Sequence, residues 1–198
     1  MKRNKQVDTL LVGSTYMRRE LERNGFNSKK IKLLPPCVQS FPQKLQNLPE
    51  QPSILFVGQL IKGKGVDVLL KAYDILCKKS TLQIPLHIIG RGNEEAELKQ
   101  FVQKTSYASL VHFHGWVAHD ELAQYYDSST VVVIPSRWPE PFGMVGVEAM
   151  LRERPVLGAD VGGIPDWLIH GKNGLLFPSN DAKALYEAMN SLVSDLKR

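Results

Sequence analysis

The stretch SRWPEPFGMVGVEAM, residues 136–150, joins a loop that carries one carboxylate to a helix that carries another. Prolines on both sides of Glu140 keep it out of regular structure, and the apolar residues from Val145 onward predict a largely buried helix that includes Glu148. The first turn of a helix presents unpaired N–H groups and the positive end of a dipole, which suit a phosphate. Gly143 lets a ligand approach the backbone because it has no Cβ. Since both carboxylates can accept hydrogen bonds from hydroxyl groups, the stretch predicts a site for a phosphorylated sugar.

From residue 53 onward, strand patterns alternate with helix patterns. Short apolar runs predict strands, and stretches with apolar residues along one side predict helices. This alternation predicts an α/β fold with a Rossmann-like parallel sheet and helices on both faces. Sites in such sheets lie beyond the carboxyl ends of the strands, where the candidate residues fall. The expected strands are residues 54–57, 86–89, 110–113, 130–134, 156–157 and 175–176, and the expected helices are residues 66–77, 94–105, 120–126, 145–151, 164–169 and 181–192.

The first 52 residues carry a shorter pattern of their own. Residues 7–13 and 31–34 predict strands. Ser14 or Thr15 is expected to cap a helix that runs to about residue 24, with Gly25 as its stop. A polar, proline-bearing stretch follows and reads as a linker. The expected organisation is a strand-helix-strand unit at residues 1–36, a linker at 37–52 and a C-terminal domain at 53–198.

The composition is that of a folded domain. A chain of 198 residues with 43% hydrophobic residues can bury a substantial core, and 23% charged residues without a low-complexity tract argue against disorder. No apolar run approaches the ~20 residues of a membrane span, and the N-terminus lacks a signal-peptide core, so the cytoplasm is the expected location. Cys37 and Cys77 are too few for a disulfide scaffold. The net charge of +5 favours anionic partners, but without a basic run interleaved with aromatic residues we predict no binding to nucleic acid.

Five motifs occur in the order typical of one enzyme family. They are FVGQL at 56–60 with KG at 64–65, EPFGMVGVEAM at 140–150, RPV at 154–156, GGIP at 162–165 and GKNGLLF at 171–177. The set resembles the donor site of the family-four retaining glycosyltransferases, also called group-1 glycosyl transferases, which have the GT-B architecture of two Rossmann-like domains. The resemblance implies that residues 53–198 are the nucleotide-sugar-binding domain and that residues 1–36 are a remnant of the N-terminal domain.

The resemblance also implies a role for each candidate residue. Lys64 and the helix start at residues 143–145 would stabilise the charge that develops on the departing nucleoside diphosphate. Glu148 would hold the ribose 2′ and 3′ hydroxyls, and Glu140 would orient the donor sugar rather than act as a general base. We therefore expect Glu140 and Lys64 to be the catalytic residues. The expected donor-binding residues are Gly58, Gln59, Lys64, Arg91, Val117, Glu140, Phe142, Gly143, Met144, Val145 and Glu148.

The loop at residues 58–65 leaves alternatives open. Taken alone, a glycine-lysine loop is more often only a flexible turn, and the family comparison reverses that reading. In the family, an arginine and a lysine neutralise the donor diphosphate, and the matching residues here are Gln59 and Lys64. Glutamine can donate a hydrogen bond but brings no charge. Leaving-group stabilisation is then either weaker or supplied by Lys62 or Arg91.

Two further positions also have alternative interpretations. In similar enzymes the backbone at the position of Val117 touches the nucleobase, and Trp116 either stacks on that base or packs on the domain surface. Asp166 stands where the family has glutamate, and it could cap the helix expected at residues 164–169.

The histidines offer little evidence of a metal site. His112 and His114 lie on one face of an expected strand, but no third ligand is evident, and His87 and His119 have no partner in the sequence. We predict no metal and no cofactor, because the nucleotide sugar is a substrate and the protein supplies the charge itself.

The expected function is transfer of a hexose-type sugar from a nucleotide sugar to an unidentified acceptor, with retention of configuration. In the resembled enzymes the acceptor binds mainly to the first domain. The chain is therefore expected to be a fragment or half of a split enzyme, inactive without the missing N-terminal acceptor domain. A peripheral contact with the inner membrane face stays open for the full-length protein. Two rivals remain, a non-catalytic nucleotide-sugar-binding or assembly module, supported by Gln59, and a nucleotide-sugar epimerase.

Overall fold

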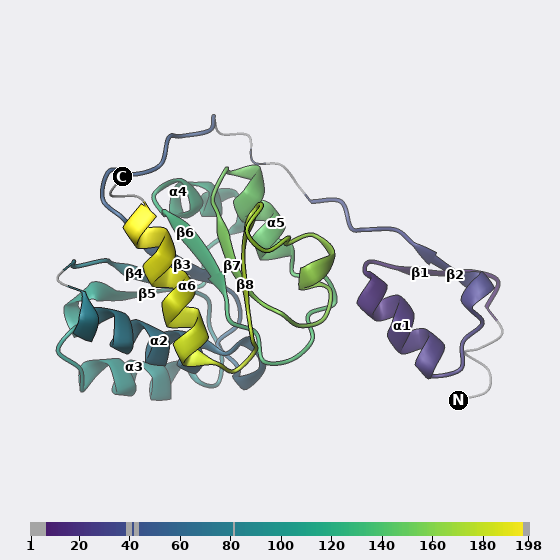
Figure 1. Ribbon diagram of the computed structural model, residues 1–198, viewed down its shortest axis with the longest axis horizontal. Coiled ribbons are helices and arrows are strands. Elements are labelled where there is room, and N and C mark those ends of the chain that lie inside the picture. Colours follow the sequence, from purple (N-terminus) through teal and green to yellow (C-terminus); the bar gives the residue numbers. More distant parts are fainter. Residues whose placement is uncertain (1–6, 39–40, 42–43, 81, 196–198) are drawn as a thin grey trace.

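A parallel sheet of six strands forms the centre of the computed structural model, which describes residues 7–38, 41, 44–80 and 82–195 (Figure 1). Across the sheet the strand order is β5-β4-β3-β6-β7-β8. The chain enters in the middle at β3, winds to one edge and returns to β6 before it winds to the other edge. The reversal between β3 and β6 is the place where ligands bind in sheets of this type. The strands are β3 (Ile54–Val57), β4 (Leu86–Ile89), β5 (Val111–Gly115), β6 (Val131–Ile134), β7 (Val156–Ala159) and β8 (Gly174–Phe177).

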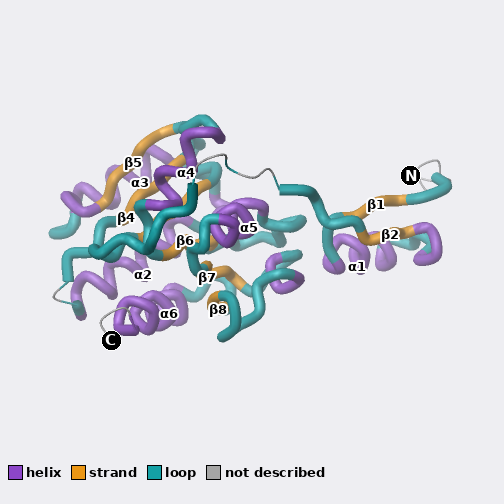
Figure 2. Tube along the Cα trace, turned by 90° about the horizontal axis from the view of Figure 1, so that it is seen from above, coloured by secondary structure: helices purple, strands orange, loops and turns teal. Residues whose placement is uncertain are grey.

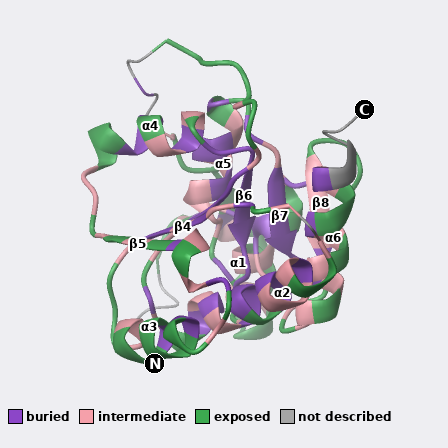
Figure 3. Ribbon diagram, turned by 90° about the vertical axis from the view of Figure 1, so that its left-hand side faces the viewer, coloured by how far each residue is buried: buried purple, intermediate pink, exposed green. Residues whose placement is uncertain are grey.

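Helices cover both faces of this sheet. Successive residues of a strand point to opposite faces, so Ile54 and Phe56 join one apolar cluster and Leu55 joins the other. Strands β6 and β7 are buried along their length (Figure 3). Figure 2 shows α2 and α6 on the opposite side of the sheet from α4 and α5. The arrangement confirms the predicted α/β class with a Rossmann-like parallel sheet. The helices are α2 (Val66–Lys79), α3 (Glu95–Gln103), α4 (Leu122–Asp127), α5 (Met144–Leu151) and α6 (Ala182–Asp195).

All the predicted strands of the sheet and the helices around it are present, but one predicted helix is shorter in the structure. The segment expected to be helical at residues 164–169 is only the 3-10 turn η6 (Ile164–Asp166). Trp167 leaves helical geometry, with φ −126°, and its indole N–H donates to the carbonyl oxygen of Phe142 at 2.6 Å. Trp167 thus takes part in a tertiary contact, which local sequence does not encode, at the point where the turn ends.

Residues near the N-terminus form a second, smaller unit, shown on the right in Figure 1. Strands β1 (Leu10–Val12) and β2 (Ile31–Leu33) pair in parallel, and α1 (Thr15–Arg23) connects them. Ser14 caps α1 as predicted, because its Oγ accepts a hydrogen bond from the Met17 N–H at 3.2 Å. Strand β1 is shorter than the predicted 7–13. Residues 1–6 of the expected N-terminal unit and residues 39, 40, 42 and 43 of the expected linker lie outside the described residues.

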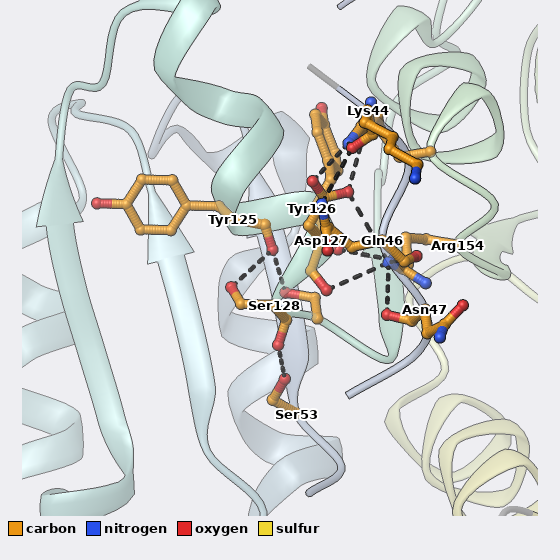
Figure 4. A network of polar contacts seen from close by, with 11 residues as sticks. Lys44, Gln46, Asn47, Ser53, Tyr125, Tyr126, Asp127, Ser128 and Arg154 are labelled. Carbon is orange, nitrogen blue, oxygen red and sulfur yellow. Dashed lines mark hydrogen bonds and ion pairs between the residues drawn. The ribbon is translucent and has the colours of Figure 1, made fainter. Parts of the chain in front are cut away.

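Two buried arginines hold the later part of the linker against the sheet domain. Figure 4 shows one of them, Arg154, beside Gln46 and Asn47 of the linker. Arg154 donates to the carbonyl oxygens of Gln46 at 2.7 Å and Asn47 at 3.1 Å, and Arg152 donates to that of Lys44 at 2.9 Å. Arg154 also donates to the carbonyl oxygen of Tyr126, at the end of α4, at 2.9 Å. The linker is therefore fixed to the sheet domain at residues 44–47.

Candidate functional site

The loops that follow β3 and β6 contact each other closely at the carboxyl edge of the sheet. Gly65 has φ +69°, and a Cβ there would lie 2.0 Å from the carbonyl oxygen of Pro135. The N–H of Arg137 donates to the carbonyl oxygen of Gly63 at 2.8 Å. Only glycine fits at position 65, because it tolerates both the left-handed backbone and the close approach. These contacts bring residues 58–65 and 135–143 together at the reversal of the strand order.

Glu140 and Lys64, which are 76 residues apart, meet in this place. The Lys64 Nζ lies 2.7 Å from the Glu140 Oε1. The side chains are 27% and 8% exposed, so the ion pair is largely shielded from water. Ser136 donates its hydroxyl to the same Glu140 oxygen at 2.5 Å. The structure thus brings together the two residues predicted to be catalytic, and it adds Ser136, which the sequence analysis did not identify.

The start of α5 faces the same loops. Gly143 precedes the helix with φ +87°, and no side chain caps this end. The indole ring of Trp167 would lie 3.3 Å from a Cβ at this position, so glycine is favoured by space as well as by backbone geometry. An uncapped helix start offers its first N–H groups to an anion. The predicted phosphate site at this helix start stays a prediction, and the uncapped N–H groups are the feature that it requires.

Glu148, in the second turn of α5, is held by one side chain from α4 and one from the turn that precedes α4. The Tyr126 hydroxyl donates to Glu148 Oε2 at 2.8 Å, and His119 Nε2 lies 3.4 Å from Oε1. Burial and the neighbouring carboxylate raise the pKa of Tyr126 well above its ordinary value, so this hydroxyl keeps its proton. The ring of Phe41 stacks on His119 with centroids 5.0 Å apart. Sequence gave no indication of either partner, because Tyr126 lies 22 residues away and reaches Glu148 only through the packing of α4 on the sheet.

A cavity of about 550 Å³ lies between the sheet domain and the small N-terminal unit. Among the predicted site residues, those that line it are Lys64, Glu140, Phe142, Gly143, Met144 and Val145. The predicted residues that do not line it are Gly58, Gln59, Arg91, Val117 and Glu148. Its wall on the N-terminal unit is largely apolar and consists of Leu11, Val12, Gly13, Met17, Leu34 and Pro36. Lys64 and Glu140 are the charged side chains among the described lining residues.

Among the described residues, the lining of this cavity does not include Lys62, Gln59 or Arg91. Lys62 is 72% exposed, lies 3.7 Å from Glu94 and lines a different hollow beside α2 and α3. Gln59 is exposed at the end of β3. Arg91 follows β4, and its guanidinium lies about 3.5 Å from the position that a Cβ on Gly115 would take. The sequence alternative in which Lys62 supplies the missing charge is therefore not supported.

Two other sequence interpretations are corrected by the structure. Asp166 does not cap its own short turn: it accepts hydrogen bonds from the backbone N–H and the hydroxyl of Thr15, both at 2.5 Å, and so caps α1 of the N-terminal unit. Trp116 is 70% exposed, which contradicts the alternative in which it packs on the domain surface. It extends from the end of β5, beside Val117.

The histidines gather more closely than the sequence indicated. His87 on β4 pairs in register with His112 on β5, and its Nδ1 lies 2.9 Å from the Nε2 of His114. Burial is the main cause that lowers the pKa of both His87 and His114, and the neighbouring imidazoles lower it further. In the part of the chain that the structure describes, no group of three His, Cys, Asp or Glu side chains is arranged to hold a metal ion.

No helix in the described ranges has both the length and the apolar character needed to cross a membrane.

The structure is thus a Rossmann-like α/β domain in which Lys64, Glu140 and the uncapped start of α5 meet at the reversal of the strand order. Residues 38–198 match the family model described as "Glycosyl transferases group 1", so the chain belongs to this family. The resemblance that the five motifs indicated is confirmed.

Individual relatives agree with this assignment. A 41.2 kDa protein of the cps region of Klebsiella pneumoniae is 32% identical over 94% of this chain and 52% of its own length. A D-inositol 3-phosphate glycosyltransferase of Paenarthrobacter aurescens is 30% identical over 87% of this chain and 45% of its own. The chain thus spans about half the length of these curated relatives.

Solved structures share the fold. Anabaena HepE in complex with UDP and glucose superposes with a TM-score of 0.85 at 22% identity, over 96% of this chain and 55% of its own. Sucrose-phosphate synthase from Thermosynechococcus elongatus superposes with a TM-score of 0.82 at 28% identity, over 98% of this chain and 51% of its own. Both likenesses confirm the Rossmann-like α/β fold that the sequence predicted.

Proposed function

We propose that this chain is the donor-binding half of a retaining glycosyltransferase that takes a hexose-type sugar from a nucleotide sugar. The contact of Lys64 with Glu140 beside the uncapped start of α5 carries the proposal. It places a positive charge, helix N–H groups and a carboxylate around one cavity, as a sugar linked to a diphosphate requires. The complex of Anabaena HepE with UDP and glucose supports a donor of this class.

Each group then has a defined task. Lys64 and the first N–H groups of α5 bind the diphosphate and stabilise the negative charge that grows on it as the bond to the anomeric carbon breaks. Glu140 accepts hydrogen bonds from the donor sugar, and Glu148 accepts them from the ribose hydroxyls. Tyr126 holds the Glu148 carboxylate in place from behind. Because the protein supplies the positive charge, donor binding needs no divalent metal.

The acceptor belongs to another part of the enzyme. In our proposal residues 53–198 form the donor domain, residues 37–52 are the linker, and residues 1–36 are one part of an N-terminal acceptor domain. The chain spans only about half of the relatives that it matches, which supports this division. We expect the chain alone to bind donor and to transfer little or no sugar until the rest of that domain is supplied.

The test is calorimetric titration with UDP-, GDP- and ADP-sugars in the presence of EDTA. We expect one nucleotide class to bind, and Lys64→Met to weaken that binding by at least about tenfold through loss of one charge contact. Lys62→Met is a matched control, since it removes a lysine from the same loop that lies outside the cavity. Absence of binding to every donor, or an equal loss in Lys62→Met, would contradict the proposal.

One observation favours a second candidate, a non-catalytic nucleotide-sugar-binding module. Gln59 brings no charge to the site, and Lys62 does not replace it, so Lys64 is the cation among the described residues that line the cavity. An assay of transfer with the N-terminal domain restored separates the two. Binding without transfer would favour the module.

A further inference from the structure

The ammonium group that a diphosphate would need is in contact with a carboxylate. Lys64 Nζ and the Ser136 hydroxyl both contact Glu140 Oε1, at 2.7 and 2.5 Å. All three side chains line the same cavity. Glu140 is buried, so it needs these partners to keep its charge at low cost.

A diphosphate and Glu140 are both anions, and both require Lys64. An ammonium can donate three hydrogen bonds, so it can touch both at once, but the two anions then repel one another in a site poorly screened by water. Glu140 can release Lys64 without a loss of stabilisation only if other hydrogen-bond donors replace the ammonium group. The hydroxyl groups of a sugar attached to the diphosphate are such donors. A nucleoside diphosphate without the transferred sugar, called the sugar-free nucleotide below, has only its ribose hydroxyls, which we assign to Glu148.

We propose that Glu140 and the donor diphosphate exchange Lys64, and that the sugar hydroxyls make this exchange possible. The intact donor gives Glu140 new partners and frees Lys64 for the diphosphate. After transfer, Glu140 takes Lys64 back and weakens the hold on the nucleoside diphosphate. The Glu140 carboxylate thereby selects the sugar-bearing nucleotide over the product and promotes product release. The inference rests on the function proposed above.

The central experiment compares Glu140→Gln with the wild-type chain by titration calorimetry. The probes are UDP and UDP-glucose, GDP and GDP-mannose, and ADP and ADP-glucose, and the pair that binds the wild-type chain is used. We expect Glu140→Gln to bind the sugar-free nucleotide about tenfold more tightly, because an amide no longer competes for Lys64. The affinity for the sugar nucleotide should rise by a smaller factor or fall. The ratio of the affinity for the sugar nucleotide to that for the sugar-free nucleotide should therefore decrease.

Glu148→Gln is the matched control. It also removes a buried carboxylate of α5, but one that contacts Tyr126 and His119 instead of Lys64. We expect this variant to bind the sugar-free nucleotide less tightly than the wild-type chain, because Glu148 also holds the ribose hydroxyls in our proposal. A gain of the same size in Glu148→Gln would mean that any lost negative charge tightens binding, and it would overturn the exchange.

Two further variants test the role of Lys64 directly. In a Lys64→Met background, adding Glu140→Gln should no longer tighten binding of the sugar-free nucleotide; a persistent gain would show simple charge repulsion and overturn the exchange. Ser136→Ala removes the other partner of Glu140, so the carboxylate should hold Lys64 more strongly and binding of the sugar-free nucleotide should weaken. This opposite sign keeps the test decisive even if Glu140→Gln does not fold.

The result separates the two proposals. If the wild-type chain binds none of the six nucleotides, the donor-binding function fails. If it binds one pair and Glu140→Gln leaves the preference between the two members unchanged, the exchange alone fails.

Discussion

Replacement of Arg154 by methionine should destabilise the fold by about 3 kcal/mol. The guanidinium is nearly fully buried and donates to the carbonyl oxygens of Tyr126 at 2.9 Å and Asp127 at 3.2 Å. It also donates to Gln46 and Asn47 in the linker. Methionine fills much of the same space but donates no hydrogen bond, so each of these acceptors must find water or stay unpaired.

The magnitude follows from which acceptors water can reach. Gln46 and Asn47 are exposed, so their carbonyl groups can be hydrated after the change at small cost. Those of Tyr126 and Asp127 lie at the end of α4 beside the core, and each buried acceptor left unpaired costs about 1 to 3 kcal/mol. Asp127 itself keeps Arg152 as its ion-pair partner, so no isolated charge is left behind. The expected total is about 2 to 4 kcal/mol.

Urea denaturation followed by circular dichroism measures this change in the free energy of unfolding. Arg18→Met is the matched control, because Arg18 forms an exposed ion pair with Glu22 and should change stability by about 0.5 kcal/mol or less. A loss below about 1 kcal/mol for Arg154→Met would refute the reasoning that these buried carbonyl groups depend on the guanidinium.

Two further predictions concern backbone fit and pH. Gly65→Ala should lower the free energy of unfolding by about 1 to 3 kcal/mol more than Gly171→Ala. Both glycines have positive φ, but only a Cβ at residue 65 would meet backbone atoms. Equal losses in urea denaturation would contradict this. The pKa values of His87 and His114 are lowered in the folded state, so their neutral forms are favoured there; stability should be full above the unfolded pKa of about 6.5 and fall as the pH drops below it. The melting temperature should therefore decline from pH 7.5 to 5.5, and His114→Gln should reduce that slope; an unchanged slope would contradict the assignment.

Local sequence predicted the sheet domain well because its elements follow from short patterns. The buried run at residues 54–57 and the one at 86–89 become β3 and β4 with the predicted bounds. The order of strands was not needed to place the site, since every candidate loop follows a parallel strand and must lie at the same edge. The contact of Lys64 with Glu140 also requires that β3 and β6 be neighbours in the sheet, which local sequence does not specify.

Contacts between distant segments could not be predicted in this way. Asp166 was assigned to its own helix, yet it caps α1, because nothing in the sequence near residue 166 reports the position of Thr15. Lys62 and Lys64 lie two residues apart in one loop, but the 3-10 turn between them sends one to the cavity and the other toward α3. Sequence specifies that both are lysines, whereas the direction of each side chain depends on the folded loop.

A crystal structure of this chain with a bound nucleotide sugar tests the central claim most directly. We predict the diphosphate within hydrogen-bond distance of Lys64 Nζ and the first N–H groups of α5, the sugar hydroxyls on Glu140, and the ribose on Glu148. A nucleotide bound elsewhere on the sheet domain, with Glu140 still paired to Lys64 and no ligand in the cavity, would contradict the account.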